Sequence, residues 1–178
     1  INDILPGARI SNAKVKEAKS KTFLITGAGG SIGAEITRQL LASNPQKIIL
    51  FELSEYNLFN IERECLAIKS SKKLDTEIIP ILGDIRDSRN LDHLFQQFTI
   101  DHIYHAAAYK HVPLVENKNN IAKAAENNIL GTYNLAEAAV KFNVHSFVMI
   151  STDKAVRPTN IMGATKRIAE IIIQSINA

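Results

Sequence analysis

Short apolar runs alternate with longer amphipathic stretches along this chain from residue 21 onward. In the longer stretches the apolar residues recur every three or four positions, which is typical of helices. The pattern predicts strands at 22–26, 47–51, 77–82, 102–106 and 146–150, and helices at 32–41, 55–69, 89–98, about 121–142 and from about 162. Because strands and helices alternate, we expect an α/β fold: a Rossmann-like, doubly wound parallel sheet covered on both faces.

Local signals agree with these boundaries. Ser31, Ser54 and Ser88 each stand where a helix should begin, as N-caps do. Residues 1–20 are polar and lysine-rich with a Pro-Gly turn, which predicts an arm or linker ahead of one domain at 21–178. Cys65 falls on an apolar helix face, so we expect a core residue rather than a nucleophile.

Composition narrows the class of protein. The chain has 178 residues, enough for one domain with a core, and its net charge of +3 is spread out, so we expect no nucleic-acid partner. No run approaches the ~18 apolar residues that span a bilayer, which predicts a cytoplasmic chain without membrane contact of its own. The chain starts at Ile1 and ends inside a helical pattern, and we therefore expect a fragment of a longer protein.

A glycine motif follows the first predicted strand and leads directly into a helix. Gly27, Gly30 and Gly33 have the spacing GxxGxxG. The first glycine permits a tight turn, the second lets the backbone approach a pyrophosphate, and the third lets the helix pack on the strand. The amides at Ser31 and Ile32 would then face the anion at the start of the helix. This context predicts a dinucleotide site.

Glu52 ends the second strand, about 20 residues beyond the glycines. Its carboxylate would accept hydrogen bonds from an adenosine ribose and repel a 2′-phosphate, which favours NAD over NADP. Alternatively, Glu52 is a solvated residue ahead of the Ser54 cap. Lys47 and Arg86 would argue for NADP if they turned toward the same pocket.

Two later strand ends offer further cofactor contacts. Asp84 could bind an adenine amino group with Ile85 beside it, or it could simply form a turn. After the fourth strand, small side chains would let the backbone pass close to a flat ligand, unless they only pack the strand end. These residues are Ala106, Ala107 and Ala108.

With these motifs in order, the chain resembles the extended short-chain dehydrogenase/reductase superfamily. The likeness rests on TGAGGSIG at 26–33, AAAYKHVP at 106–113 and NILGT at 128–132. Within the superfamily, ISTDKAVRPTNIMGATKR at 150–167 is similar to the UDP-N-acetylglucosamine 4,6-dehydratase group of polysaccharide biosynthesis proteins. Met162 stands where most of the superfamily carries a catalytic tyrosine, four residues before Lys166, and the larger members of the group share this methionine.

The resemblance implies a reaction and roles for residues. Such enzymes oxidise C4 of a nucleotide sugar with bound NAD, eliminate water across C5 and C6, and return the hydride to C6. Thr152 would hydrogen-bond the 4-hydroxyl, Asp153 would protonate the leaving C6 hydroxyl, and Lys154 would remove the C5 proton. Lys166 would hold the nicotinamide ribose, and Asn128 would also bind the cofactor.

Several points stay open at this stage. Lys154 needs desolvation or a nearby cation such as Lys166 to act as a base, because an ordinary lysine titrates near 10.4. Asp153 and Lys154 could instead form a surface ion pair. The base for the 4-hydroxyl could be Asp153, a water on Thr152, or Tyr109, and His111 either lines the sugar pocket or is structural.

Other functions compete with the dehydratase. A UDP-sugar 4-epimerase shares the fold but has no use for an acid and a base after Thr152, while a noncatalytic NAD-binding module would explain the missing tyrosine. The resemblance also implies a nucleotide-sugar substrate bound largely by a region beyond residue 178. It further implies a homo-oligomer formed through the helices at 133–140 and 168–173, and a membrane-anchored parent whose cytoplasmic domain this would be.

Overall fold

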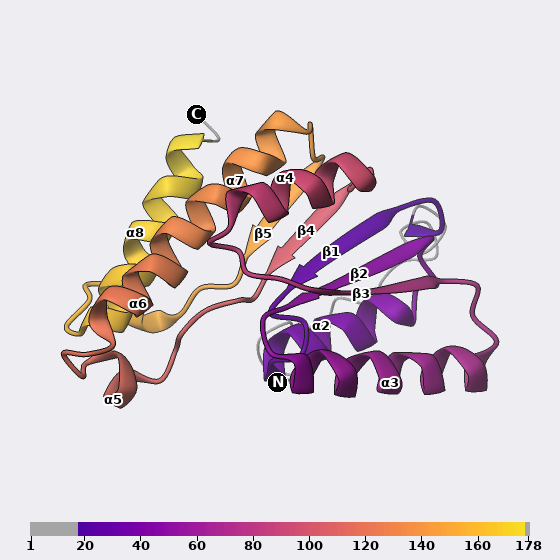
Figure 1. Ribbon diagram of the computed structural model, residues 1–178, viewed down its shortest axis with the longest axis horizontal. Helices are drawn as coiled ribbons and strands as arrows, with labels where there is room; N and C mark the ends of the chain where they lie inside the picture. Colours follow the sequence, from indigo (N-terminus) through magenta and orange to yellow (C-terminus); the bar gives the residue numbers. More distant parts are fainter. Residues whose placement is uncertain (1–17, 177–178) are drawn as a thin grey trace.

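The computed structural model describes residues 18–176 and shows one five-stranded parallel sheet (Figure 1). The strands are β1 (Thr22–Thr26), β2 (Lys47–Glu52), β3 (Glu77–Leu82), β4 (His102–His105) and β5 (Ser146–Met149). They are ordered β3-β2-β1-β4-β5, so the chain winds outward from β1 in both directions. The predicted doubly wound fold is confirmed, and most of the predicted arm lies outside the described residues.

Helices follow each strand at the predicted places, with one departure. The helices are α2 (Ser31–Leu41), α3 (Glu55–Lys72), α4 (Ser88–Gln97), α5 (Val112–Val115), α6 (Ile121–Ala125), α7 (Gly131–Lys141) and α8 (Ile161–Ile176). Between α6 and α7 the backbone forms a π-helical turn, η1 (Glu126–Leu130), and a 3₁₀ turn, η2 (Asp153–Ala155), precedes α8. The long helix expected at 121–142 therefore contains a π-helical segment, a feature often found at functional sites.

Two of the three predicted caps were wrong by one residue. Ser54 caps α3 and accepts a hydrogen bond from the Asn57 amide. The N-cap of α4 is Asp87, whose carboxylate accepts from two helix amides, so Ser88 is already inside the helix. Gly30 is the N-cap of α2, which places Ser31 in the first turn. The Asp87 carboxylate, one residue before the predicted cap, already satisfies two free amides of the first turn of α4.

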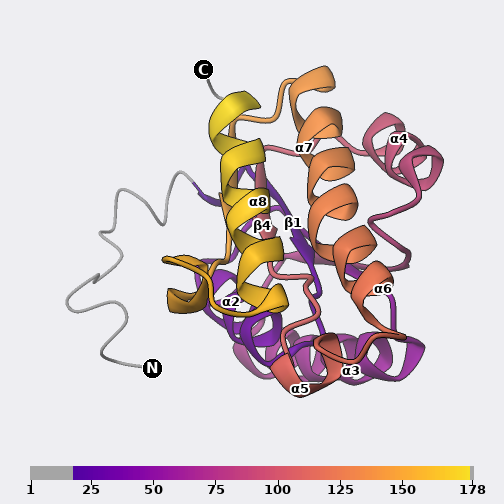
Figure 2. The same ribbon diagram turned by 90° about the vertical axis from the view of Figure 1, so that its left-hand side faces the viewer.

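Two hydrophobic clusters fill the two faces of the sheet. Successive residues of a strand point to opposite faces. Leu24 therefore packs with the α4 and α7 side, whereas Ile25 packs with α2 and α3. Figures 1 and 2 show α2 and α3 on one side of the sheet and α4, α7 and α8 on the other, with α8 alongside α7. Cys65 is fully buried in the α2–α3 cluster, which confirms its place in the core.

The parallel strands bring five chain segments to one edge of the sheet. Thr26, the last residue of β1, pairs with Phe51 on one side and His105 on the other, and His105 in turn pairs with Met149. The residues that follow each strand are therefore neighbours in space. None of the helices among residues 18–176 has the length and apolar character needed to cross a membrane.

Candidate active site

A cavity of about 1270 Å³ opens at this edge of the sheet, lined by segments that follow all five strands. It exceeds the roughly 300–1000 Å³ of most small-molecule pockets. Most of the residues singled out from the sequence line it: Gly27, Gly30, Ser31, Ile32, Gly33, Glu52, Asp84, Ile85, Ala106, Ala107, Ala108, Thr152, Lys154, Met162 and Lys166. Asn128 and Asp153 do not line it.

The glycine turn is shaped by close backbone contacts. Gly27 has a φ of +66°, and a Cβ there would lie 2.7 Å from the Ala107 backbone. A Cβ on Gly33 would lie 2.1 Å from the Gly27 carbonyl oxygen. At Gly30 the nearest atom would be the Gly27 carbonyl oxygen at 3.3 Å, a tight contact but not an overlap, and this glycine faces the cavity. The turn and the start of α2 thus present backbone amides to the cavity.

Glu52 is buried in the wall beside this turn. One carboxylate oxygen accepts from the Gly29 amide at 3.0 Å, and the other accepts from the amides of Leu53 and Ser54 at 3.0 and 3.1 Å. Glu52 is therefore not a solvated loop residue, because it joins the glycine turn to the start of α3. The contact with Gly29 was not expected from the sequence.

The two basic residues that could have favoured NADP are held by acids. Lys47 lies at the far end of β2 and forms an ion pair with Glu77 at 2.6 Å. Arg86 lines the cavity, but its guanidinium binds both oxygens of Asp84. The hydrogen bonds from Arg86 lower the pKa of the Asp84 carboxyl, so Asp84 is a carboxylate at neutral pH.

Asn128 lies behind the cavity wall, which differs from its expected position. Its Oδ1 accepts from the Tyr109 amide at 2.8 Å, and its Nδ2 donates to the Tyr109 carbonyl and to Thr165 Oγ1. Asn128 therefore holds the loop after β4 against α8. A sequence motif could not show which of two adjacent asparagines faces the cavity.

Asn127, which sequence reasoning missed, lines the cavity instead. Its Nδ2 donates to Asn128 Oδ1 at 3.1 Å. Asn128 Oδ1 also accepts from a backbone amide, so it is an acceptor and the Asn127 atom that faces it must be the donor, Nδ2. This fixes the orientation of the Asn127 side-chain amide. No residue between 18 and 176 donates a hydrogen bond to Asn127 Oδ1. This oxygen is not among the fully buried side-chain atoms, so it remains accessible from the cavity as an acceptor.

His105 is a second residue that the sequence did not single out. It is fully buried between the hydroxyls of Thr26, 2.7 Å from Nδ1, and Thr132, 2.9 Å from Nε2. The Thr132 hydroxyl donates to the Asn128 carbonyl, so His105 Nε2 must be the donor and Nδ1 the acceptor. Burial, with a smaller effect from Lys166, lowers the pKa of His105 to about 3. The neutral ring braces β1 and β4 against the helix that carries the asparagines.

The Thr152–Lys154 segment follows β5 at the mouth of the cavity. The Thr152 hydroxyl and Lys154 Nζ both donate to the same oxygen of Asp153, at 3.0 and 3.2 Å. The Asp153 side chain is 87% exposed and that of Lys154 is 49% exposed. The desolvation that Lys154 would need as a base is therefore absent from this arrangement. The hydrogen bonds from Thr152 and Lys154 also lower the pKa of Asp153.

Met162 and Lys166 lie one helical turn apart on α8, and both are buried in the cavity wall. Met162 packs against Val115 and Ala124. Burial lowers the pKa of Lys166 to about 8, and the charge of Glu170 acts in the opposite direction. In the described chain no hydrogen bond or ion pair involves Lys166 Nζ. Lys166 is therefore the strongly desolvated amine of this site, while Tyr109 and His111 lie at its more exposed rim.

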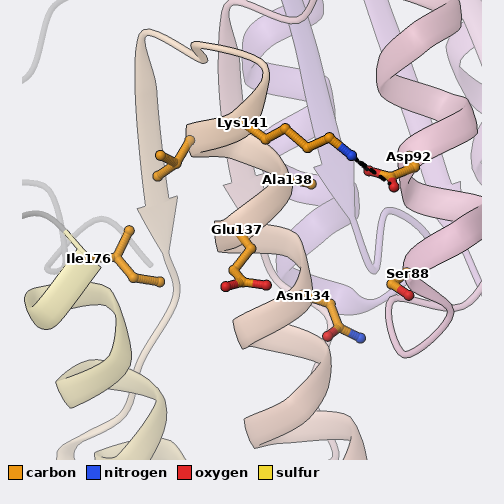
Figure 3. A pocket seen from close by; sticks show the side chains of 8 residues that line it. Ser88, Asp92, Asn134, Glu137, Ala138, Lys141 and Ile176 are labelled. Carbon is orange, nitrogen blue, oxygen red and sulfur yellow. Dashed lines mark hydrogen bonds and ion pairs between the residues drawn. The ribbon is translucent and has the colours of Figure 1, made fainter.

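A second hollow of about 560 Å³ lies away from the strand ends, between α4, α7 and the end of α8 (Figure 3). Figure 3 shows the ion pair of Lys141 and Asp92, 2.9 Å long, on one side of this hollow and Ile176 on the other. It contains none of the residues singled out as site residues from the sequence. Val140, which also lines it, belongs to the helix face expected to mediate self-association.

Comparison with known proteins places the chain in a family. The polysaccharide biosynthesis protein family matches residues 23–178. The chain belongs to this family. The capsular polysaccharide biosynthesis protein CapD of Staphylococcus aureus is 48% identical over 162 residues, which cover 91% of this chain and 26% of CapD. The X-ray structure of Pen from Bacillus thuringiensis is similar with a TM-score of 0.77 and 35% identity, covering 89% of this chain and 46% of that one.

Proteins similar to this chain carry two kinds of enzyme name. A UDP-N-acetylglucosamine 4,6-dehydratase (inverting) of Campylobacter jejuni is 34% identical over 88% of this chain and 44% of its own length. A UDP-glucose 4-epimerase of Rickettsia canadensis is 31% identical over 84% and 42%. WbmG of Bordetella bronchiseptica, solved with NAD, shares the fold with a TM-score of 0.68 at 23% identity over 95% and 51%. The chain thus spans a quarter to a half of these relatives.

Proposed function

We propose that this chain is the cofactor-binding part of an NAD-dependent nucleotide-sugar 4,6-dehydratase acting on UDP-N-acetylglucosamine-like substrates. The observation that carries the proposal is the grouping of Thr152, Lys154, Met162 and Lys166 around one cavity. A thioether at position 162 exchanges no protons, so acid and base must come from elsewhere. The Thr152–Lys154 segment at the cavity mouth offers both.

The cavity fits a dinucleotide. Bound NAD would take a hydride from the sugar and later return it. The amides of the glycine turn would bind the pyrophosphate, and the Glu52 oxygen that accepts only from Gly29 keeps a lone pair for a ribose hydroxyl. Asp84 and Ile85 would border the adenine, with Ala106–Ala108 allowing close approach. Asn127 Oδ1 would accept a hydrogen bond from the cofactor, and Lys166 would hold the nicotinamide ribose.

The reaction removes one water in total. Asp153 would take the 4-hydroxyl proton as hydride leaves C4, which makes a 4-ketone that acidifies the C5 hydrogen, and this proton would later leave in the water. Lys154 then takes the C5 proton while Asp153 protonates the departing C6 hydroxyl, and hydride returns to C6 as a proton returns to C5. The elimination needs a protonated Asp153 and a neutral Lys154, whereas an ion pair consists of a carboxylate and an ammonium group. We therefore propose that the bound sugar covers this segment and separates the Asp153–Lys154 pair.

The proposal also covers the full-length protein. We propose that a region outside this chain completes the nucleotide-sugar pocket, that the protein is a homo-oligomer, and that its catalytic part works on the cytoplasmic side. In the three relatives named above the matched segment covers 26%, 44% and 42% of the length.

The test is mass spectrometry of UDP-N-acetylglucosamine after incubation with the full-length protein and NAD. We expect a product lighter by one water, and loss of that product in Asp153→Asn and Lys154→Met. Lys118→Met serves as a matched control because Lys118 is exposed and lies outside the cavity. NAD binding with an unchanged substrate would overturn the dehydratase and favour a noncatalytic module.

An epimerase is the second candidate, because an epimerase is among the 31%-identical relatives. It would give an isomer of unchanged mass, separable from the substrate by chromatography. Position 162 argues against it, since an epimerase is expected to keep a tyrosine there.

A further inference from the structure

Glu170 lies on α8 one turn beyond Lys166 and has a partner for each carboxylate oxygen. Ser151 Oγ donates to Oε1 at 2.5 Å, and Arg167 Nη1 donates to Oε2 at 2.9 Å. Ser151 is the residue immediately before Thr152. The Glu170 carboxylate therefore connects the start of the Thr152–Lys154 segment to the helix that carries Lys166.

A second contact holds the other end of the same segment. A Cβ on Gly163 would lie 2.2 Å from the Lys154 carbonyl oxygen, so backbone and helix touch there. The Gly163 amide donates to Asn160 Oδ1 at 2.7 Å, which secures the return into α8. Because α8 is one continuous helix, these contacts set the spacing between the segment and Lys166.

Glu170 also acts on Lys166 through its charge. It is the negative group that opposes the effect of burial on the Lys166 pKa. Between residues 18 and 176 no ion pair involves Lys166, so Glu170 acts on it through space, and the titratable groups on neighbouring elements form no ion pair with it either; burial keeps His105 neutral. Those groups are His105, Tyr109, Glu116, Lys123, Glu126, Tyr133, Glu137, Lys141, Asp153 and Lys154.

We infer that Glu170 is a positioning residue: it ties the Thr152–Lys154 segment to α8 through Ser151 and balances the charge of Lys166. This inference rests on the proposed function, since it assigns the segment and Lys166 to one reaction. Glu170 itself lies outside the cavity lining, so its effect passes through Ser151 and Lys166.

Two contributions of Glu170 can be tested separately by substitution in the full-length protein. One is its hydrogen bond with Ser151, called the tether below, and the other is its negative charge near Lys166. Ser151→Ala removes the hydroxyl but leaves the Glu170 charge, and Ser151→Thr keeps a hydroxyl. Glu170→Gln keeps an acceptor for Ser151 but removes the charge. Arg167→Gln is the matched control, because it removes the other partner of Glu170 on the exposed side of the helix.

For the tether we expect Ser151→Ala to lower kcat about 10- to 100-fold, because small displacements of reacting groups are that costly. NAD affinity should not change, Ser151→Thr should restore most of kcat, and Arg167→Gln should match the unsubstituted protein. A Ser151→Ala protein with unchanged kcat would overturn the tether. So would a loss that Ser151→Thr does not restore.

For the charge we expect Glu170→Gln to move the Lys166 titration, followed by ¹³Cε NMR of labelled lysine, to lower pH. The alkaline limb of the kcat/KM profile should move with it, whereas Ser151→Ala should leave the titration unchanged. A Lys166 pKa that is the same in Glu170→Gln would overturn the electrostatic link. The titration needs no substrate, so it tests the electrostatic link even if the unsubstituted protein shows no turnover. Absence of turnover in the unsubstituted protein would overturn the proposed function instead.

Discussion

At the scale of single residues, the amino group of Lys166 lies in the wall of the cavity, where it is poorly solvated. Burial lowers its pKa from 10.5 to about 8. A charge without a hydrogen-bonded partner in such a place costs stability, and proteins keep such groups mostly where they act on a ligand. The cost can be measured as a dependence of stability on pH.

We predict that Lys166→Met makes the folded protein more stable near pH 7. Between about pH 8 and 10.5 the unfolded chain binds more protons at this lysine than the folded chain, so the stability of the unsubstituted protein rises across that range. The Met variant should gain up to about 3 kcal/mol near pH 7 and less near pH 10. Urea unfolding at the two pH values checks this, and an equal difference at both would contradict it.

The two adjacent asparagines should separate stability from binding. Asn128→Ala removes hydrogen bonds to the Tyr109 backbone and Thr165, and we expect it to cost about 2–4 kcal/mol of folding free energy. Asn127→Ala loses one hydrogen bond to Asn128 and should cost about 1 kcal/mol. NAD affinity should fall about tenfold in Asn127→Ala, the loss of one hydrogen bond to the ligand. Thermal unfolding measures the loss of stability, and calorimetric titration measures the loss of NAD affinity. A larger loss of stability in Asn127→Ala, or a larger loss of NAD affinity in Asn128→Ala, would contradict these roles.

At the scale of elements, the glycine turn joins β1 to α2 through contacts that permit no side chain at two of its three motif glycines. The Gly27 carbonyl is packed against Gly33, while Gly30 faces the cavity. One motif therefore combines packing positions with a position that is free for a ligand. Substitution by alanine distinguishes the two.

We predict that Gly33→Ala destabilises the fold by about 3 kcal/mol, because the added methyl group would overlap a backbone carbonyl. Gly30→Ala should change stability by about 1 kcal/mol or less, since its nearest neighbour would be 3.3 Å away. It should nevertheless weaken NAD binding, because the methyl group would lie in the path of the pyrophosphate. Melting temperatures and NAD affinities of the two variants provide the test. Equal destabilisation by both substitutions would show that Gly30 is also a packing position.

At the scale of the whole molecule, Cys65 reports on the integrity of the core. It is the only cysteine in the sequence, it is fully buried, and burial raises the pKa of its thiol to about 11. A thiol reagent reacts with a thiol that is both exposed and deprotonated, and the folded core keeps the Cys65 thiol buried and protonated.

We predict that Cys65 reacts with a thiol reagent only through unfolding of the α2–α3 side of the sheet. Labelling should be slow under native conditions and fast in concentrated urea, and NAD should slow it further if it binds the folded state. Mass spectrometry of the labelled chain gives the rate. Labelling at the rate of a free thiol in the native protein would contradict the packing described here.

The sequence by itself determined the architecture and which residues gather at the candidate site. Strand and helix periods reflect which residues can be buried, so the alternation of short apolar runs with helical stretches was sufficient to predict a parallel sheet covered on both faces. Parallel strands end at one edge, which brought the glycine turn, Glu52, Asp84 and the Thr152–Lys154 segment together without knowledge of any contact.

Only the tertiary structure decided how individual side chains are used, because burial and hydrogen bonding depend on partners far apart in the chain. It placed Asn127 rather than Asn128 at the cavity, gave Glu52 to the Gly29 amide, and made His105 a neutral brace. It also left Asp153 exposed while desolvating Lys166. A pKa is set by such surroundings, and no spacing of residues along a chain specifies them.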